Sequence, residues 1–282
     1  MSNNKENKKR LAIYIVIVYS FAVLVLLISK FGGTFSSAYE IGSTLFNFSP
    51  AIACILTRFA TDEGFGDMKL NFHFRGNMKY YLLAVCLPII GGLVSGVLPF
   101  IICGEGGVFA GLTVKKFLSA IFMLLTSAIF TWITMVGEEL GWRGYMNQKM
   151  EPLFGTVGTC IIGGIVWGTW HFPGNLSYVL YGDGSLTEAL KMDLDRIICL
   201  TLLGVMLMYL TKRTDSIIPA AIAHYLYNAS FLLAQYLGDF SEDYIMPDQV
   251  SGLSDTLLLA VLGVYAAVFL ILMLKDKKEK ET

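Results

Sequence analysis

Apolar stretches about as long as one bilayer crossing recur along most of this chain. A helix needs about 20 apolar residues to cross the roughly 30 Å hydrocarbon core of a bilayer. About eight stretches approach that length. They cover residues 11–29, 41–60, 80–102, 117–136, 157–179, 197–211, 217–237 and 257–274. Backbone amides in hydrocarbon must be satisfied within helices or closed barrels. We therefore expect an all-α, polytopic membrane bundle of about eight helices.

The composition agrees with a lipid environment. Of the 282 residues, 55% are hydrophobic and only 15% are charged, whereas a soluble domain has about 25% charged residues. The net charge of −1, without a basic patch, gives no reason to expect nucleic acid as a partner. The five cysteines form no CxxC pair, so we expect neither a disulfide framework nor a thiolate metal site.

Lysine and arginine are unevenly distributed between the connections, and this predicts an orientation. They gather at the N-terminus, between the second and third spans, and after the fourth, sixth and eighth spans. The connection before the last span has none, and Lys115 and Lys116 are the one exception to the pattern. Cytoplasmic loops carry such an excess. We expect one membrane domain over residues 1–282, with both termini cytoplasmic and the run 11–29 retained as the first span.

Three ionised groups follow the fourth predicted span, in the sequence VGEELGWRGYMNQ. Glu138 and Glu139 are neighbours, so on a helix they point about 100° apart and cannot share one role. Arg143 lies four residues after Glu139, the spacing of a helical ion pair, which leaves Glu138 to face elsewhere. A free carboxylate can act as a general base. The alternative is a charged cap where the span meets the cytoplasm.

Two of the three histidines fall inside predicted spans. His224 lies four residues before Asn228, so on a helix both project from one face. Such a pair can position a water, bind a metal or support an oxyanion, and it can equally join two helices. His171 lies just before a proline, where a helix weakens, and irregular backbone at this depth requires protein or water around it. Trp167 and Trp170 could anchor this region at the membrane interface or line a pocket.

The four side chains of Glu138, His171, His224 and Asn228 could together activate a water molecule and stabilise a tetrahedral intermediate. A glutamate and two histidines can also bind zinc through three protein ligands, with a fourth position left open. No serine lies in a G-x-S-x-G sequence and no cysteine neighbours a histidine, so no nucleophile is evident.

Three ordered motifs resemble those of the CAAX-protease and bacteriocin-processing family of intramembrane endopeptidases. They are Glu138-Glu139-x3-Arg143, an aromatic residue four positions before His171, and His224-x3-Asn228. The family is also known as the type II CAAX prenyl endopeptidases, or Abi proteins. The likeness covers about residues 117–237, the expected catalytic core, and the eight-span layout agrees outside it.

The resemblance implies a helical bundle with a cavity open to the cytosol, and hydrolysis of a peptide or prenylated protein near the cytoplasmic face. It assigns water activation to Glu138 and His171, and support of the oxyanion to His224 and Asn228. The family has been described both as metal-dependent and as using a metal-free glutamate mechanism. The sequence leaves both open, with Glu138, His171 and His224 as the candidate zinc ligands.

The resemblance also makes Glu139 and Arg143 a structural pair, in agreement with their spacing. The second motif usually begins with phenylalanine, and Trp167 keeps its aromatic character. Some bacterial members act in bacteriocin maturation or self-immunity, so a non-catalytic immunity or peptide-binding protein is the alternative, with a transporter less favoured. We expect a bacterial plasma membrane protein whose partners are the lipid bilayer and a peptide or lipidated-protein substrate.

The predicted spans leave a mismatch in depth between the candidate residues. Glu138 falls near the inner end of the fourth span, whereas His171 would lie roughly 20 Å higher if the fifth span began near residue 157. The residues meet only if the fifth span begins later or the fourth is broken or tilted. Gly137, Gly141 and Gly144 would permit such a break.

Overall fold

The computed structural model describes residues 2–32, 37–180, 182, 184–230, 232–241 and 243–281. These residues contain helices and turns but no strand, which confirms the all-α class. The helices are α1 (Ser2–Gly32), α2 (Ser37–Ala60), α3 (Met78–Gly96), α4 (Leu98–Ile102), α5 (Val114–Gly141), α6 (Asn147–Trp170), α7 (Phe172–Leu180), α8 (Leu186–Thr214), α9 (Ile218–Ser230), α10 (Leu233–Leu237) and α11 (Asp248–Glu281). A 3₁₀ turn, η1 (Gly106–Phe109), and a π-helical turn, η2 (Trp142–Met146), lie on either side of α5.

Five helical stretches among the described residues are long and apolar enough to cross a membrane. They are Asn4–Ile28, Met78–Ile102, Thr131–Ser177, Leu186–Thr214 and Asp248–Asp276. The chain is therefore an integral membrane protein, although the expected count of about eight spans is not confirmed. α9 shows one reason. It has 13 residues, or about 20 Å of helix, which is too short to cross the hydrocarbon core alone.

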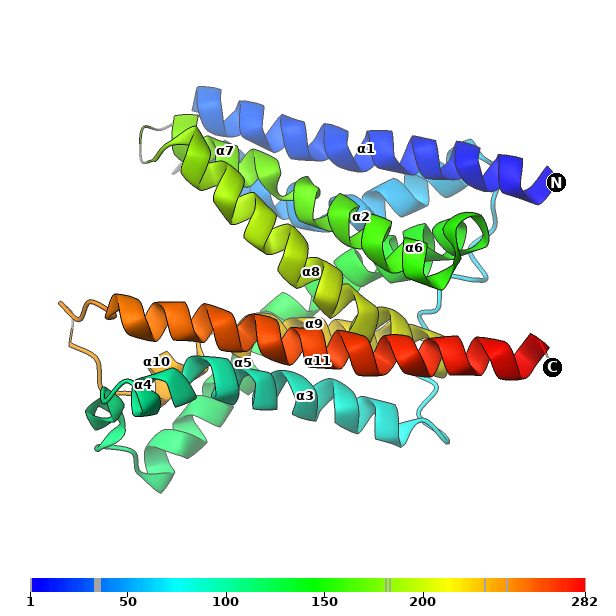
Figure 1. Ribbon diagram of the computed structural model, residues 1–282. Helices are drawn as coiled ribbons and strands as arrows, with labels where there is room; N and C mark the ends of the chain where they lie inside the picture. The colour runs from blue at the N-terminus through cyan, green and yellow to red at the C-terminus, as the bar shows by residue number, and fades with distance from the viewer. Residues whose placement is uncertain are drawn as a thin grey trace.

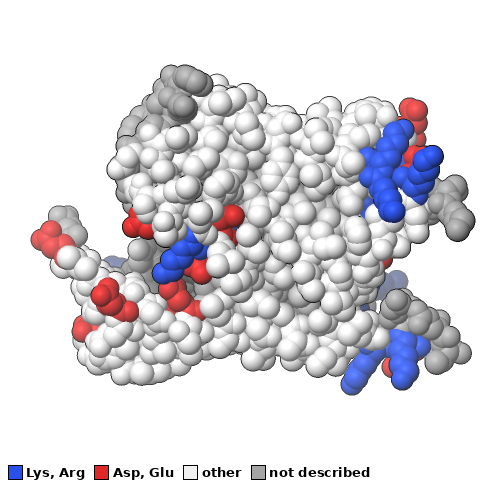
Figure 2. All heavy atoms as spheres, turned by 45° about the horizontal axis from the view of Figure 1, so that its top comes forward, with Lys and Arg blue, Asp and Glu red and all other residues white. Residues whose placement is uncertain are grey.

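Both chain termini lie at one end of the bundle (Figure 1). α1, α2 and α6 form one side, α3 and α11 form the other, and α8 crosses obliquely between them. α9 lies in the middle and packs against α3, α5 and α8. Lys and Arg side chains gather at the end that carries the termini (Figure 2). This arrangement agrees with an even number of crossings, while the side of the membrane that this end faces stays a prediction.

Side-chain caps begin two of the long helices. Thr113 accepts a hydrogen bond from the backbone N–H of Lys116 at the start of α5. Ser185 and Glu188 form a capping box at the start of α8, each side chain bonding the backbone N–H of the other. α8 therefore begins well before the predicted span 197–211. That prediction followed the apolar run alone and missed the helix-start signal in the polar residues before it.

The chain path from α5 into α6 sets the depth of the polar residues. α5 continues to Gly141, beyond the predicted end of the fourth span, and η2 carries the helix onward. The direction changes at Gly155, whose φ of +67° is a conformation that other residues rarely adopt. From Glu138 to this turn the helices rise about 26 Å, and from the turn back to Trp167 about 18 Å. The expected difference in depth between Glu138 and His171 is removed, because the chain first continues past Glu138 to the turn at Gly155 and then runs back by a similar length.

α6 and α8 lie in close backbone contact. A Cβ atom built on Gly168 would lie 2.6 Å from the Cα of Ile197, and one built on Gly164 would lie 2.5 Å from the Cα of Thr201. Any side chain at these two glycines would force the helices apart. The pairing shows that α6 and α8 run antiparallel, with each turn of one beside a turn of the other.

Candidate active site

Glu138 lies in the last turn of α5 and is buried, with 5% of its surface exposed. Its Oε2 accepts a hydrogen bond of 3.2 Å from Nε1 of Trp167, which lies near the end of α6. The two residues are 29 positions apart in the sequence. The return of the chain at Gly155 therefore brings the first and second motifs into direct contact.

Glu139 is the centre of a second buried cluster. Nη1 of Arg143 donates a hydrogen bond of 2.8 Å to Glu139 Oε1, which confirms the ion pair predicted from their spacing. Nδ1 of His224 lies 3.0 Å from the same oxygen. These three side chains are at most 4% exposed. Glu139 therefore holds His224 as well as Arg143. The sequence could not reveal this role, because His224 is 85 positions away.

Trp167 joins the two clusters. Besides its hydrogen bond to Glu138, its ring lies under the guanidinium of Arg143, with 4.1 Å between Cζ and the ring centroid. The same ring meets His224 edge-on, with centroids 5.0 Å apart. Phenylalanine, the usual family residue here, could supply both ring contacts but has no N–H to donate. The indole is thus an addition that the aromatic pattern alone did not single out.

His171 lies between α6 and α7, one helical turn after Trp167. Its Nδ1 is 3.1 Å from the Trp167 carbonyl oxygen. A carbonyl can only accept, so Nδ1 carries a proton and the lone pair of the neutral ring is on Nε2. The ring packs edge-on against Trp170 and Phe46, with centroid distances of 4.6 and 6.2 Å. These contacts leave Nε2 as the atom that can act as a base.

Trp167 contacts Glu138 and His224 through its ring, and its carbonyl oxygen lies near Nδ1 of His171. His224 lies within range of electrostatic interaction with both of the other side chains. Asn228 stands apart from them: it is exposed, and its Nδ2 lies 3.4 Å from Sδ of Met135. Within the described part of the chain, it forms no hydrogen bond to Glu138, His171 or His224. The structure thus places three of the four predicted catalytic side chains around Trp167, whereas Asn228 lies apart from them.

The candidate zinc ligands are not arranged as a metal site. Among the residues that the structure describes, no group of three His, Cys, Asp or Glu side chains could hold a metal ion. Nδ1 of each histidine has another partner, which leaves Nε2 free as in many metal-bound histidines, so the mismatch lies in how the three groups are placed and not in their chemistry. In this arrangement Glu138, His171 and His224 do not fit a three-ligand set. The mechanism below therefore uses the side chains of the chain itself.

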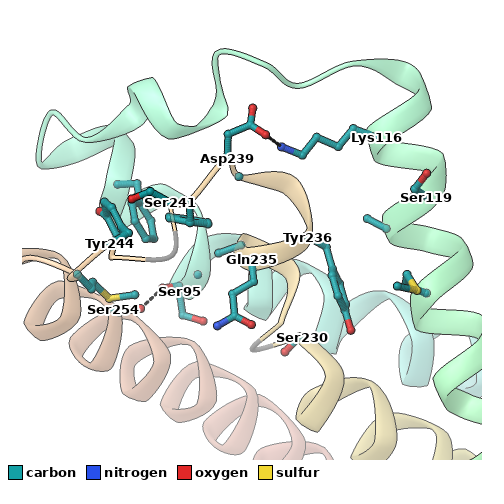
Figure 3. Close-up of a pocket in the computed structure, with 18 of the residues that line it drawn as sticks. Ser95, Lys116, Ser119, Ser230, Gln235, Tyr236, Asp239, Ser241, Tyr244 and Ser254 are labelled. Atoms are coloured by element: carbon teal, nitrogen blue, oxygen red, sulfur yellow. Dashed lines mark hydrogen bonds and ion pairs between the residues drawn. The ribbon is translucent and has the colours of Figure 1, made fainter.

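A cavity of about 870 Å³ lies at the end of the bundle opposite the termini, and no candidate catalytic side chain lines it (Figure 3). Lys116 and Asp239 form an ion pair at one side of it, and Gln235 and Tyr236 project into it from α10. This cavity is therefore separate from the candidate catalytic residues.

Comparison with known proteins covers the segment that holds all the candidate catalytic residues. Residues 117–230 match the sequence model of a family described as type II CAAX prenyl endopeptidase Rce1-like. We refer to residues 117–230 as the Rce1-like segment, for its similarity to that family. The match includes all three motifs, and it confirms the family resemblance predicted from them.

Part of this chain is also similar to a curated relative. The "CAAX prenyl protease 2" of Methanococcus maripaludis is 30% identical over 113 residues. The match covers 40% of this chain and 39% of that protein. The chain thus spans about two fifths of the length of the curated relative it matches. The buried contacts among the three motifs lie within the segment that matches the family model.

Proposed function

We propose that this chain is an intramembrane endopeptidase that hydrolyses a peptide bond by means of a water molecule activated by Glu138 and His171. One observation carries the proposal. The segment that matches the endopeptidase family holds a buried glutamate and two histidines that each contact Trp167, inside a membrane bundle. A buried ionisable group in a membrane protein is costly, so a cluster of them favours a functional role.

In this mechanism, the water oxygen forms a bond to the scissile carbonyl carbon as Glu138 or His171 Nε2 takes its proton. The same group then returns the proton to the amine as the carbon–nitrogen bond breaks. Trp167 binds one oxygen of Glu138 and orients the carboxylate. This is the role of a positioning residue, since the indole does not meet the reacting atoms.

His224 and Asn228 would support the oxyanion. His224 already directs Nδ1 to Glu139, so it can donate from Nε2 only as the doubly protonated imidazole. Asn228 lies one turn further along α9 and has an exposed amide that can donate on the same face. Glu139 and Arg143 act through His224 by holding its ring in place.

The proposed substrate is a peptide or a lipidated protein that reaches the site from the bilayer. His224 lies about 9 Å of helix rise from Ile218, the first residue of α9. The basic side chains gathered at the end of the bundle that carries the termini support the placement of that end on the cytoplasmic side (Figure 2). We therefore propose cleavage near the cytoplasmic face, with a bacterial plasma membrane as the proposed location.

The test uses the purified full chain in detergent and an internally quenched peptide. We expect Glu138→Gln and His171→Ala each to lower kcat by about 100-fold or more without loss of helical circular dichroism. Glu6→Gln, an exposed glutamate of α1, is the control and should keep full activity. Full activity in both site variants would exclude this mechanism.

Two further measurements test whether the reaction depends on a metal and whether the protein acts in immunity without hydrolysis. Activity with and without a chelator distinguishes the metal-dependent from the metal-free form of the reaction. Expression in cells exposed to a bacteriocin tests the immunity reading. Protection that survives Glu138→Gln would favour a peptide-binding role over hydrolysis.

A further inference from the structure

Arg196 is a charged residue inside the membrane-length helix α8, in the stretch Leu186–Thr214. A charged side chain in a membrane-length helix normally faces a partner or a cavity. No carboxylate in the described part of the chain lies within ion-pair distance of its guanidinium. Asp193, one turn earlier, is buried and accepts a hydrogen bond from Asn175 over 3.5 Å, and it interacts electrostatically with Arg196 from beyond ion-pair distance.

The packing of α6 on α8 places Arg196 beside the candidate active site. Gly168 contacts Ile197, the residue after Arg196, and lies three residues before His171. Arg196 also interacts electrostatically with His171 and with Tyr227 of α9. The guanidinium is therefore close to both helices that carry the candidate histidines.

Part of this arginine is accessible from outside the bundle. Its side chain is half-buried. A guanidinium binds a carboxylate through two parallel N–H···O bonds, a geometry that a lysine cannot reproduce. Such a partner would offset the cost of the buried charge.

We propose that Arg196 binds a carboxylate group of the peptide substrate and thereby sets the specificity of the site for anionic peptides. The identification of the bound carboxylate as part of a substrate rests on the proposed function. The carboxylate is either the C-terminus of the peptide or an Asp or Glu side chain, because both present the same group to the guanidinium. Arg196 is a substrate-binding residue in this scheme and takes no part in proton transfer.

The experiment measures binding separately from cleavage. The full chain with Glu138→Gln is placed in nanodiscs, and binding of fluorescent peptides is followed by anisotropy. The probes are one glutamate-containing peptide as the free acid, its C-terminal amide, its Glu→Gln form, and the form with both changes. We expect loss of the bound carboxylate to weaken binding about 10- to 100-fold. Arg196→Gln should cause a similar loss, and the two changes together should cost little more than one.

Matched variants distinguish recognition from a structural role. Lys191→Gln removes an exposed cation of the same helix and should leave peptide binding unchanged. Arg196→Lys should recover only part of the affinity, because it keeps the charge but loses the planar fork. If Arg196→Gln does not fold, the inference is tested by Arg196→Lys and by the altered peptides on protein that keeps Arg196.

Two results would overturn the inference. In one, removing either carboxylate weakens binding by the same factor with and without Arg196, or not at all. In the other, adding Asp193→Asn restores binding to Arg196→Gln, which would make the arginine only a counter-charge for Asp193. Parallel cleavage assays with Glu138 intact separate this inference from the proposed function. Carboxylate-dependent binding without cleavage supports the former alone, and cleavage without carboxylate preference supports the latter alone.

Discussion

Two ion pairs at opposite parts of the bundle differ mainly in their burial. Glu139 and Arg143 lie 2.8 Å apart, with side chains 0% and 3% exposed. Lys116 and Asp239 form their pair beside the cavity of Figure 3, with side chains 22% and 64% exposed. In the buried pair, Glu139 also contacts His224 and Arg143 also contacts Trp167. Among the described residues, the side chains of the exposed pair hydrogen-bond only to each other.

The comparison shows why the buried charges are expected to be functional. Desolvation of two ions can exceed their mutual attraction, so a buried pair is weak evidence for stability by itself. An exposed pair is worth about 0–1 kcal/mol because water screens it. We therefore propose that the Glu139–Arg143 pair orients His224, and this can be tested by removing the charges singly and together.

The largest effect is expected from Arg143→Ala. This change leaves the Glu139 carboxylate buried without its cation and should cost about 3–5 kcal/mol of unfolding free energy. Denaturant unfolding in detergent, followed by tryptophan fluorescence, measures the loss. A cost below about 1 kcal/mol, the range of exposed pairs, would show that the two regions do not differ as described.

Removing both charges separates stability from activity. In the double variant Glu139→Gln with Arg143→Met, no ion is left unpaired, so most of the unfolding free energy should return. Peptide cleavage should stay low, because His224 has lost the carboxylate that held its ring. A double variant that is both stable and fully active would show that the pair has no role in positioning His224.

An intermediate effect is expected from Trp167→Phe. The ring contacts remain, but Glu138 loses the indole N–H, a hydrogen bond to a charged group worth about 1.5–3 kcal/mol. We expect kcat to fall at least about tenfold, with little change in KM, because the substrate does not meet this N–H. Trp170→Phe is the matched control, since Trp170 Nε1 donates to Ser49 over the same 3.2 Å. Equal losses of kcat in the two variants would contradict the positioning role.

The smallest effect is expected from Lys116→Ala. Its ion pair with Asp239 is partly solvated, so the unfolding free energy should change by less than about 1 kcal/mol. Cleavage should be unchanged, because the pair lies beside a cavity that no candidate catalytic side chain lines. Unfolding and cleavage measured beside Arg143→Ala complete the comparison, and a large loss of activity here would connect the cavity to the reaction.

The sequence predicted the class of the fold and the local part of the site well. Apolar length indicated membrane helices, and the i,i+4 spacing predicted the Glu139–Arg143 pair. The boundaries were less accurate. The fourth span was expected to end at residue 136 and α8 to begin near residue 197, because the apolar runs end there while the helices continue through polar residues. The predicted sides of the membrane remain predictions.

Helical periodicity acts over a few residues, so the amino-acid order alone could reveal the pairing of Glu139 with Arg143 and the presence of three ordered motifs. The contacts of Glu138 with Trp167 and of Glu139 with His224 depended on the fold. They form because the chain turns back at Gly155 and α9 packs against α5. The relative depth of two helices depends on the path of the backbone and on packing, and the local spacing of residues does not encode either.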